Sequence, residues 1–344
     1  MPTKPWLFVL GTRPEAIKLA PLVREFMKRA IPFEVCWTGQ HVGLLDPALK
    51  AEMGGTELGL ASANDPLAYV EAALKALGAS LEPDRLRGVI VQGDTASAWS
   101  GAIWGVLRGI SVAHVEAGLR SGDLDDPWPE EMIRCWIDAN AIYRFCPTAL
   151  AKQHLGTPEA VDVVTGNTVV DALQALGIRR TGVGAYALVT LHRRESFGAP
   201  LRAIVSGLCE VAAASPWLNF VWPLHSNPEV RRSLVGLTVP ANVLLAEPLP
   251  YRAFVERLAG ARAVLTDSGG VVEEAATLGV PCAIARDHTE RPEAIDAGCA
   301  KLAGRSADSV ATALAWALSA TIAPSTCFGD GHASERIADC LENA

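Results

Sequence analysis

The sequence lacks the features that mark an exported, membrane-spanning or metal-binding protein. Its eight cysteines are scattered and include no Cys-x-x-Cys pair, and its seven histidines show no metal-ligand spacing. No charged-then-apolar leader precedes the apolar strand that begins at Trp6, and the longest candidate membrane segment, residues 310–322, is too short to span a bilayer. We therefore expect a cytoplasmic protein with reduced, buried thiols, no bound metal and no membrane partner.

Positive charge is also scarce. Asp and Glu number 38 against 30 Lys and Arg, which gives a formal net charge of -8. This balance argues against nucleic acid or an anionic membrane surface as the main partner. A phosphorylated small molecule is not excluded, because a few backbone amides and a few Arg or Lys side chains are enough to bind it.

Length and apolar content favour two domains. At 344 residues the chain is longer than one core comfortably fills, and half of its residues are apolar. Short apolar runs alternate with segments of helical period, which is typical of parallel sheets covered by helices on both faces. We expect an α/β protein with two doubly wound, Rossmann-like domains and a central cleft. The domains would span residues 1–176 and 187–328, and the Gly-rich residues 177–186 would link them.

The periodicity also predicts where the longer helices lie. They are expected at residues 14–29, 66–78, 96–108, 129–140, 168–176, 201–214, 228–237, 251–260 and 270–278.

Residues that follow the strands are the first candidates for a site, because open α/β sheets bind ligands outside the carboxyl ends of their strands. Arg13 and Lys18 follow the first strand. Two cations near a helix N-terminus would attract a phosphate. Solvated surface charges are the alternative interpretation of both.

Three carboxylates follow strands or begin helices in the same half. Asp94 comes directly after an apolar strand and either serves a reaction or caps the next helix. Glu116 ends another apolar strand, where an acid must be functional or paired, with Arg120 or His114 as structural partners. Glu130 begins a helix, where the helix dipole alone explains an acid. Together these acids predict proton transfer, because carboxylates with different pKa values can move protons.

The second half carries residues suited to a diphosphate. His192 comes directly after a strand and is followed by two arginines, and His225 follows another strand. A basic surface turn and a capping histidine are the alternatives. Ser268-Gly269-Gly270 lies between an apolar strand and a helix, where glycines let a ligand approach the helix amides. A tight structural turn explains the same three residues. A carboxylate on that helix would suit the hydroxyls of a ribose, and Arg291 adds a cation.

Several longer motifs occur in a fixed order along the chain. They read GTRPEAIKLAPL, TGQH, QGDT, HVEAGLRSGD, PWPEE, TGNTVVDAL, HRRESFG, DSGG and TERPEA. From about Gly11 to the final helix, the chain resembles the non-hydrolysing UDP-N-acetylglucosamine 2-epimerases of bacteria. Hydrolysing relatives usually carry an Arg-Ala-Asp type of sequence after the first strand. This chain has Arg13-Pro14-Glu15 there, which favours the non-hydrolysing branch.

The resemblance implies a glycosyltransferase-B-like fold in which residues 329–344 form a helical segment that crosses back to the first domain. It implies a homodimer that reversibly inverts C2 of UDP-N-acetylglucosamine to give UDP-N-acetylmannosamine for a surface polysaccharide. No cofactor such as NAD and no metal would take part. In this family UDP is eliminated to leave 2-acetamidoglucal and then adds back to the other face.

The resemblance also implies roles for individual residues. By motif position, Asp94, Glu116 and Glu130 would form the acid/base set, and His192 would assist at the diphosphate. Nucleotide contacts are implied for Arg13, Lys18, Phe254 (near the uracil), Ser268, Gly269, Gly270, Glu274 and Arg291. A second, allosteric UDP-sugar site is implied at Gln40, His41 and His225.

Departures from the family pattern leave alternatives open. Val42 stands where relatives usually carry Arg, and residues 58–67 lack the usual pattern, so retention of allosteric activation stays open. His288 replaces a more usual Thr and Leu249 a polar residue near the base. These two changes leave open a modified UDP-2-acetamido sugar of the diacetamido-uronate type. A UDP-sugar-dependent glycosyltransferase and a non-catalytic UDP-sugar sensor are the remaining alternatives.

Overall fold

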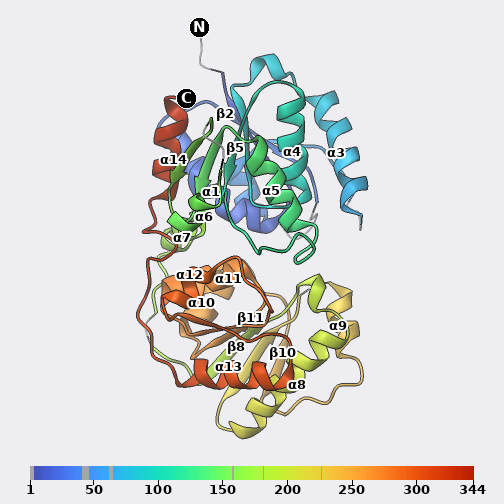
Figure 1. Cartoon of the computed structure of the whole chain (residues 1–344), viewed down its shortest axis with the longest axis vertical. Helices are drawn as coiled ribbons and strands as arrows, with labels where there is room; N and C mark the ends of the chain where they lie inside the picture. The colour runs from blue at the N-terminus through green and yellow to red at the C-terminus, as the bar shows by residue number, and fades with distance from the viewer. Residues whose placement is uncertain (1–3, 41–45, 62–64, 157–158, 181, 226) are drawn as a thin grey trace. The chain divides into compact units, whose positions relative to one another are not determined.

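The computed structural model describes residues 4–40, 46–61, 65–156, 159–180, 182–225 and 227–344. The chain forms two compact units (Figure 1). The first comprises Met1–Ala175 and Gly329–Ala344, and the second comprises Leu176–Phe328. Each unit is built on a parallel sheet, which confirms the predicted α/β class with two doubly wound, Rossmann-like halves.

The sheet of the first unit has the strand order β3-β2-β1-β4-β5-β6-β7. The strands span β1 Trp6–Leu10, β2 Phe33–Trp37, β3 Thr56–Glu57, β4 Gly88–Gln92, β5 Ser111–Val115, β6 Tyr143–Cys146 and β7 Val161–Val164. The order of the strands along the chain reverses between β1 and β4, and the connections leave to opposite sides there. Such a switch point is where doubly wound sheets bind their ligands.

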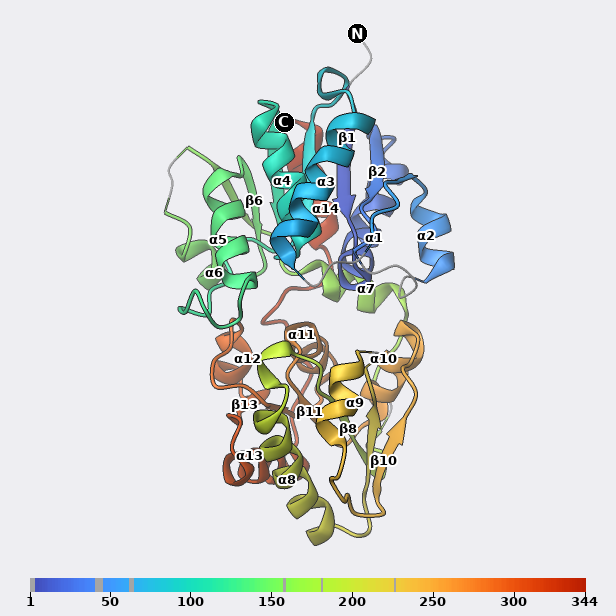
Figure 2. The ribbon, with the colours of Figure 1, turned by 90° about the vertical axis from the view of Figure 1, so that its right-hand side faces the viewer.

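Strand β1 shows why helices cover both faces of this sheet. Its five residues are all buried, with Trp6, Phe8 and Leu10 in one apolar cluster and Leu7 and Val9 in another. The first cluster takes in α1 (Arg13–Lys28) and α14 (Ala333–Glu342), and the second takes in α4 (Ala96–Leu107) and α5 (Glu130–Asn140). Figure 1 shows α4 on one side of β2 and β5 and α1 and α14 on the other, and Figure 2 looks onto the face that α3 (Pro66–Ser80) covers.

Helix α14 belongs to the first unit, although the second unit separates it in sequence from the rest of that unit. Ile337 and Leu341 are fully buried in the cluster of β1 and α1. The indole of Trp6 donates a hydrogen bond to the Leu341 carbonyl at 3.3 Å. The carboxylate of Asp171, on α7 (Thr168–Ala175), accepts from the backbone N–H of Ser334 at 2.7 Å. The last helix is therefore part of the core of the first unit.

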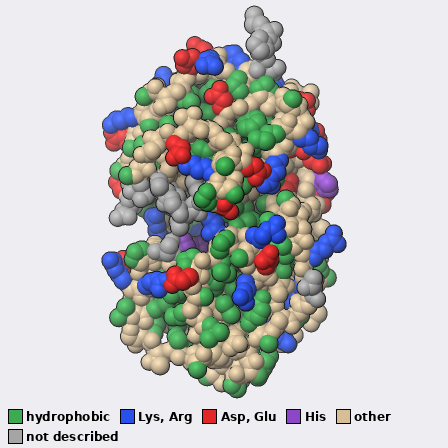
Figure 3. All heavy atoms as spheres, turned by 180° about the vertical axis from the view of Figure 1, so that it is seen from behind, with side chains coloured by type: hydrophobic (Ala, Val, Ile, Leu, Met, Phe, Trp, Pro, Cys, Tyr) green, Lys and Arg blue, Asp and Glu red, His purple; other side chains and the backbone are tan. Residues whose placement is uncertain are grey.

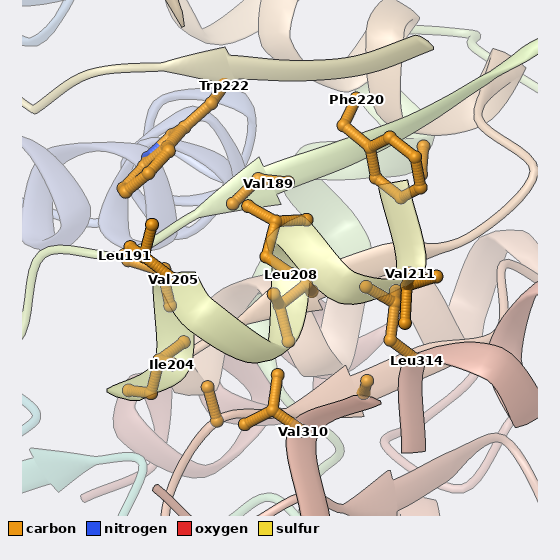
Figure 4. Close-up of a cluster of buried hydrophobic side chains, with 14 of the residues drawn as sticks. Val189, Leu191, Ile204, Val205, Leu208, Val211, Phe220, Trp222, Val310 and Leu314 are labelled. Carbon is orange, nitrogen blue, oxygen red and sulfur yellow. The ribbon is translucent and has the colours of Figure 1, made fainter. Parts of the chain in front are cut away.

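The sheet of the second unit has the order β10-β9-β8-β11-β12-β13, with its own switch point between β8 and β11. The strands span β8 Tyr186–Thr190, β9 Asn219–Pro223, β10 Val243–Ala246, β11 Val264–Thr266, β12 Cys282–Ile284 and β13 Ala300–Leu302. One face packs on α8 (Ala199–Ala214) and α13 (Ala307–Ser319). Figure 4 shows Val189 and Trp222 of the sheet above Leu208 of α8 and Leu314 of α13.

The remaining helices connect strands in the two units. In the second unit they are α9 (Pro228–Leu234), α10 (Tyr251–Gly260), α11 (Gly269–Leu278) and α12 (Pro292–Asp296); in the first, α2 (Pro47–Met53) and α6 (Ala149–Gln153). All nine helices expected from the sequence are present, with ends within three residues of the prediction.

Three general expectations can be compared with the described residues. All eight cysteines have free thiols, and burial raises the pKa of Cys36 and of Cys146 to about 12, so these two stay protonated at neutral pH. Among the described helices none is both long and apolar enough to cross a membrane, and no described cluster of His, Cys, Asp or Glu suits a metal ion. The face in Figure 3 intermixes Lys and Arg with Asp and Glu side chains.

Candidate active site

The turn after β1 is held by a buried acid. Thr12 caps α1, and Glu15 completes a capping box by accepting from the backbone N–H of Thr12 at 2.7 Å and of Gly11 at 3.1 Å. The other oxygen of Glu15 accepts from the Thr95 hydroxyl at 2.8 Å. Burial raises the pKa of Glu15 to about 7, against the opposing effect of these hydrogen bonds. Glu15 thus ties the start of α1, where Arg13 lies, to the start of α4 across the switch point.

Glu116 follows β5 in an uncommon backbone conformation. Its φ is 72°, in the left-handed region that costs a residue with a side chain about 1–2 kcal/mol. Its buried carboxylate accepts from Lys18 of α1, from the Gln92 amide at 3.0 Å and from the Asn167 amide at 3.1 Å. Such strain, kept in place by three donors, is typical of functional positions.

The two structural partners considered for Glu116 from the sequence were wrong. His114 and Arg120 bind Asp138 of α5 instead, at 2.7 Å and 2.6 Å. Lys18 is itself buried and paired with Glu116, so it is not a solvated surface charge.

Asp94 lies in the turn after β4 and is bound by α5. Arg134 of α5 donates to the Asp94 carboxylate from two nitrogens, Nε at 3.1 Å and Nη2. The same guanidinium donates to Glu131, whose carboxylate in turn accepts from the Ser121 backbone N–H at 3.0 Å. Thr95 rather than Asp94 caps α4, so the capping alternative for Asp94 was wrong.

Glu130 is the first residue of α5 and is half-buried. Its neighbour Glu131 and the residues Arg134 and Asp138 follow at spacings of three and four along one face of the helix. One helix therefore presents a candidate acid at its first residue and holds a second, Asp94, through Arg134.

In the second unit, two histidines stack at neighbouring strand ends. The rings of His192, after β8, and His225, after β9, lie 5.2 Å apart at an interplanar angle of 21°. The backbone N–H of His192 donates to the buried carboxylate of Asp267 at 2.9 Å, and that of Asn227 donates to the His225 Nδ1 at 3.1 Å. A helix cap is not the role of His225, since Asn227 caps α9.

The Ser-Gly-Gly turn begins α11 at the second switch point. Ser268 is the N-cap residue, and its side chain makes no capping hydrogen bond. A Cβ atom at Gly269 would lie 2.3 Å from a guanidinium nitrogen of Arg291, so only glycine allows this approach. Arg291 is itself buried and bound to Glu273 at 2.7 Å and to Glu290 at 3.3 Å. The helix start therefore rests on a cation that two carboxylates hold in place.

Glu274 and Phe254 come from adjacent helices of the second unit. The buried Glu274 of α11 accepts a hydrogen bond from the Tyr251 hydroxyl of α10 at 2.8 Å. Phe254 lies three residues after Tyr251 on α10 and is half-buried. Roles toward a ribose and a uracil stay predictions for these two residues.

Comparison with known proteins identifies the family. A family model described as UDP-N-acetylglucosamine 2-epimerase matches residues 25–342. The chain belongs to this family.

Relatives agree over nearly the whole chain. The probable UDP-N-acetylglucosamine 2-epimerase of Ralstonia solanacearum is 39% identical, with 98% of each chain covered. The crystal structure of the UDP-GlcNAc 2-epimerase of Neisseria meningitidis bound to UDP-GlcNAc has a TM-score of 0.89 at 33% identity, over 98% of this chain and 100% of that one. The Methanocaldococcus jannaschii UDP-GlcNAc 2-epimerase in complex with UDP-GlcNAc and UDP has a TM-score of 0.89 at 32% identity, over 98% and 99%.

The predicted allosteric residues of this UDP-GlcNAc 2-epimerase family member are only partly described. The Gln40 side-chain oxygen accepts from the Ser97 backbone N–H at 2.9 Å and from the Ser97 hydroxyl at 2.7 Å, which ties it to α4. His41 and Val42 lie outside the described residues, as do residues 62–64 of the altered segment.

The structure brings some predicted residues together and adds others. Lys18 meets Glu116, and Asp94 meets the helix that begins at Glu130. The sequence interpretation missed Gln92 and Asn167, which donate to Glu116, and Arg134, which donates to Asp94. In the second unit it missed Tyr251, which donates to Glu274, and Asp267, which accepts from the His192 backbone. The spacing of residues 131, 134 and 138 on one predicted helix face was the available signal for Arg134.

Proposed function

We propose that this protein is a non-hydrolysing UDP-N-acetylglucosamine 2-epimerase. It interconverts UDP-N-acetylglucosamine and UDP-N-acetylmannosamine through elimination of UDP to 2-acetamidoglucal and re-addition of UDP, with the proton returned to the opposite face of C2. Membership of the family and the relatives' bound UDP-GlcNAc support the substrate class. The observation that carries the chemistry is Glu116, a buried acid in a left-handed turn with three donors on its carboxylate.

The proposed chemistry needs two proton positions. One group removes the C2 proton while the C1–O bond to the diphosphate breaks and a C1–C2 double bond forms. Another group then protonates C2 from the opposite face as a diphosphate oxygen of UDP attacks C1. The C2 proton is a poor acid, so a positioned base is required. We assign these roles to the set Asp94, Glu116 and Glu130, with Arg134 keeping Asp94 in its carboxylate form.

The nucleotide half is assigned to the second unit. The amides at the start of α11, from Ser268 to Gly270, bind the diphosphate, with its charge complemented by the helix dipole. Glu274 accepts hydrogen bonds from the ribose hydroxyls, and Phe254 packs near the uracil. His192 assists the leaving diphosphate, which must be both stabilised and retained for the second half of the reaction.

Arg13, Lys18 and Arg291 complete the proposed contacts. Arg13 begins α1, where a cation and the helix N-terminus attract the same anion. Lys18 acts through Glu116 and Arg291 through the start of α11, given the pairs that each makes.

Proton NMR of UDP-N-acetylglucosamine with the purified protein in D2O tests the proposal. We expect UDP-N-acetylmannosamine to appear with deuterium at C2. Free N-acetylmannosamine with UDP would instead assign the protein to the hydrolysing branch. No conversion, with UDP still bound, would overturn the proposed substrate and favour a modified UDP-2-acetamido sugar, for which Leu249 and His288 are the departures from the family pattern. Transfer of the sugar to an added acceptor would favour a glycosyltransferase.

The resemblance carries three further parts of the proposal: a homodimer, a cytoplasmic location and supply of a surface polysaccharide. Light scattering of the purified protein tests the first, and a monomer at micromolar concentration would contradict it.

A further inference from the structure

We infer that His114 is a positioning residue, which fixes the turn that carries Asp94 to the turn that carries Glu116. The inference rests on the proposed function, because both acids belong to the proposed acid/base set. His114 lies on β5, two residues before Glu116, and its side chain is fully buried. It touches neither acid directly and acts through their backbones.

Each ring nitrogen of His114 faces an acceptor. Nε2 lies 2.8 Å from the carbonyl oxygen of Gly93, the residue before Asp94. Nδ1 lies 2.7 Å from a carboxylate oxygen of Asp138 on α5. A carbonyl only accepts, so Nε2 carries a proton.

The surroundings of Asp138 fix the carboxylate that faces Nδ1. Its other oxygen accepts from the Gly118 backbone N–H at 3.0 Å and from Arg120 at 2.6 Å. Burial raises the pKa of Asp138, but the charges and hydrogen bonds of His114 and Arg120 outweigh it and leave the pKa below its ordinary value. Asp138 is therefore a carboxylate with donors at both of its oxygens. A buried charge of this kind persists only when it is paired on every side.

This group of three, which we call the His114 cluster (His114, Arg120 and Asp138), reaches both turns. Through Gly93 it holds the turn of Asp94, and through Gly118 it holds the turn that begins at Glu116. Gly118 has a φ of 84°, and a Cβ atom there would lie 2.1 Å from the Ala151 carbonyl oxygen. The turn that begins at Glu116 is therefore also packed closely against Ala151.

Helix α5 is the common support of the arrangement. Its Asp138 anchors the His114 cluster, and its Arg134, one turn earlier, binds the carboxylate of Asp94. The backbone and the side chain of the Asp94 turn are thus fixed by the same helix that begins with Glu130. Proton removal and return at opposite faces of one carbon require the acids to keep a set separation, and an error of about 1 Å costs on the order of 100-fold in rate.

Two substitutions of His114 separate the two bonds. In His114→Gln the amide nitrogen reaches about as far as Nε2 and keeps the bond to Gly93. In His114→Asn the amide nitrogen replaces Nδ1, so the bond to Asp138 is kept and the bond to Gly93 is lost. Val112→Ala, on the same strand and the same face as His114 with a buried side chain in the apolar cluster of α4 and α5, is the control for loss of stability alone.

The measurements are kcat, KM, Tm and the ratio of C2 deuterium exchange to inversion. For His114→Asn we expect kcat to fall about 10- to 100-fold with KM within about 3-fold, and the ratio to rise because abstraction is uncoupled from reprotonation. His114→Gln should keep more of kcat than His114→Asn. Val112→Ala should lower Tm and leave kcat and the ratio as in the wild type. Equal kcat and ratio in His114→Asn and the wild type, or equal changes in Val112→Ala, would overturn the inference.

Failure of the proposed function would be visible separately, as an inactive wild type. In that case 15N NMR of histidine-labelled protein decides about the His114 cluster, with His114 assigned by the signal lost in His114→Gln. A protonated Nε2 is expected, because the Gly93 carbonyl can only accept, and an unprotonated Nε2 would overturn the inference.

Discussion

The acidic side chains of this protein differ in what sets their pKa, and for Glu15 the largest influence is burial. Its carboxyl group is inaccessible to solvent, and its pKa rises to about 7 from an ordinary value of 4.5. The folded state therefore binds a proton that the unfolded state has already released between these pH values. Stability from this group is complete below pH 4.5 and is lost as the pH rises through about 7.

Glu15→Gln removes this pH dependence. Relative to the variant, the wild type should lose about 3 kcal/mol of unfolding free energy between pH 4.5 and pH values above 7, since each pKa unit corresponds to about 1.4 kcal/mol. Urea unfolding of both proteins across this range measures the difference. A difference that does not vary with pH would show that Glu15 is ionised throughout.

Asp94→Asn tests the acid/base set at the level of one atom. The amide keeps an oxygen to accept from Arg134 but cannot take up a proton, so UDP affinity should be unchanged while kcat falls by about 100-fold or more. Isothermal titration with UDP and the NMR assay in D2O measure the two quantities. Turnover at the wild-type rate would remove Asp94 from the set.

At this scale the sequence predicted which acids to examine but not their partners. Asp94 and Glu116 were found because an acid at the end of an apolar strand is conspicuous. Their partners Gln92, Arg134 and Asn167 depend on strand register and helix rotation. The same limit explains why His114 and Arg120 were considered as partners of Glu116 instead of Asp138. Residues 114 and 116 would share one side of a continuous strand, but the left-handed turn at Glu116 redirects the chain.

Among the elements, α11 shows how a neighbouring buried side chain can determine which residue begins a helix. Ser-Gly-Gly in the sequence suggested only that a ligand approaches the backbone. In the structure the first glycine makes room for Arg291, and the second has open space around its Cβ position among the described residues. Two neighbouring glycines thus serve different needs.

Gly269→Ala should push Arg291 away from Glu273 and lower the affinity for UDP. The added methyl would lie 2.3 Å from a guanidinium nitrogen that has little room to move. Loss of a hydrogen bond to a charged phosphate corresponds to about 10- to 100-fold in Kd. Titration calorimetry measures it, with Gly182→Ala, which meets no atom within 4 Å, as the control. Unchanged affinity would exclude the start of α11 from the nucleotide site.

Helices were easier to predict than the shortest elements. Thr, Asp or Asn at the cap marks α1, α3, α4 and α9 in the sequence, and proline at the first turn also marks α1, α3 and α9. The elements that were missed include α2, β3 and β13, which are seven, two and three residues long and mostly exposed, so they lack a periodic apolar pattern.

For the whole molecule, α14 makes the core of the first unit depend on distant sequence. Leu341→Ala should lower the stability of the first unit by about 2–5 kcal/mol, because it leaves a cavity beside Trp6. Hydrogen exchange should then speed up in β1 and α1 and stay unchanged in β8 and α8, with the exposed Asn343→Ala as the control. Equal acceleration in both units would show that they unfold together.

The return of the chain to its first unit also has a consequence during synthesis. The 153 residues from Leu176 to Phe328 are translated between α7 and α14 (328 - 176 + 1). At the usual pace of about 5–20 residues per second, this takes roughly 8–30 s. During that time the apolar surface of the first unit that Ile337 and Leu341 of α14 later cover stays open to water. The nascent first unit is thus a natural client for a chaperone, whereas the second unit carries all of its own core as it emerges.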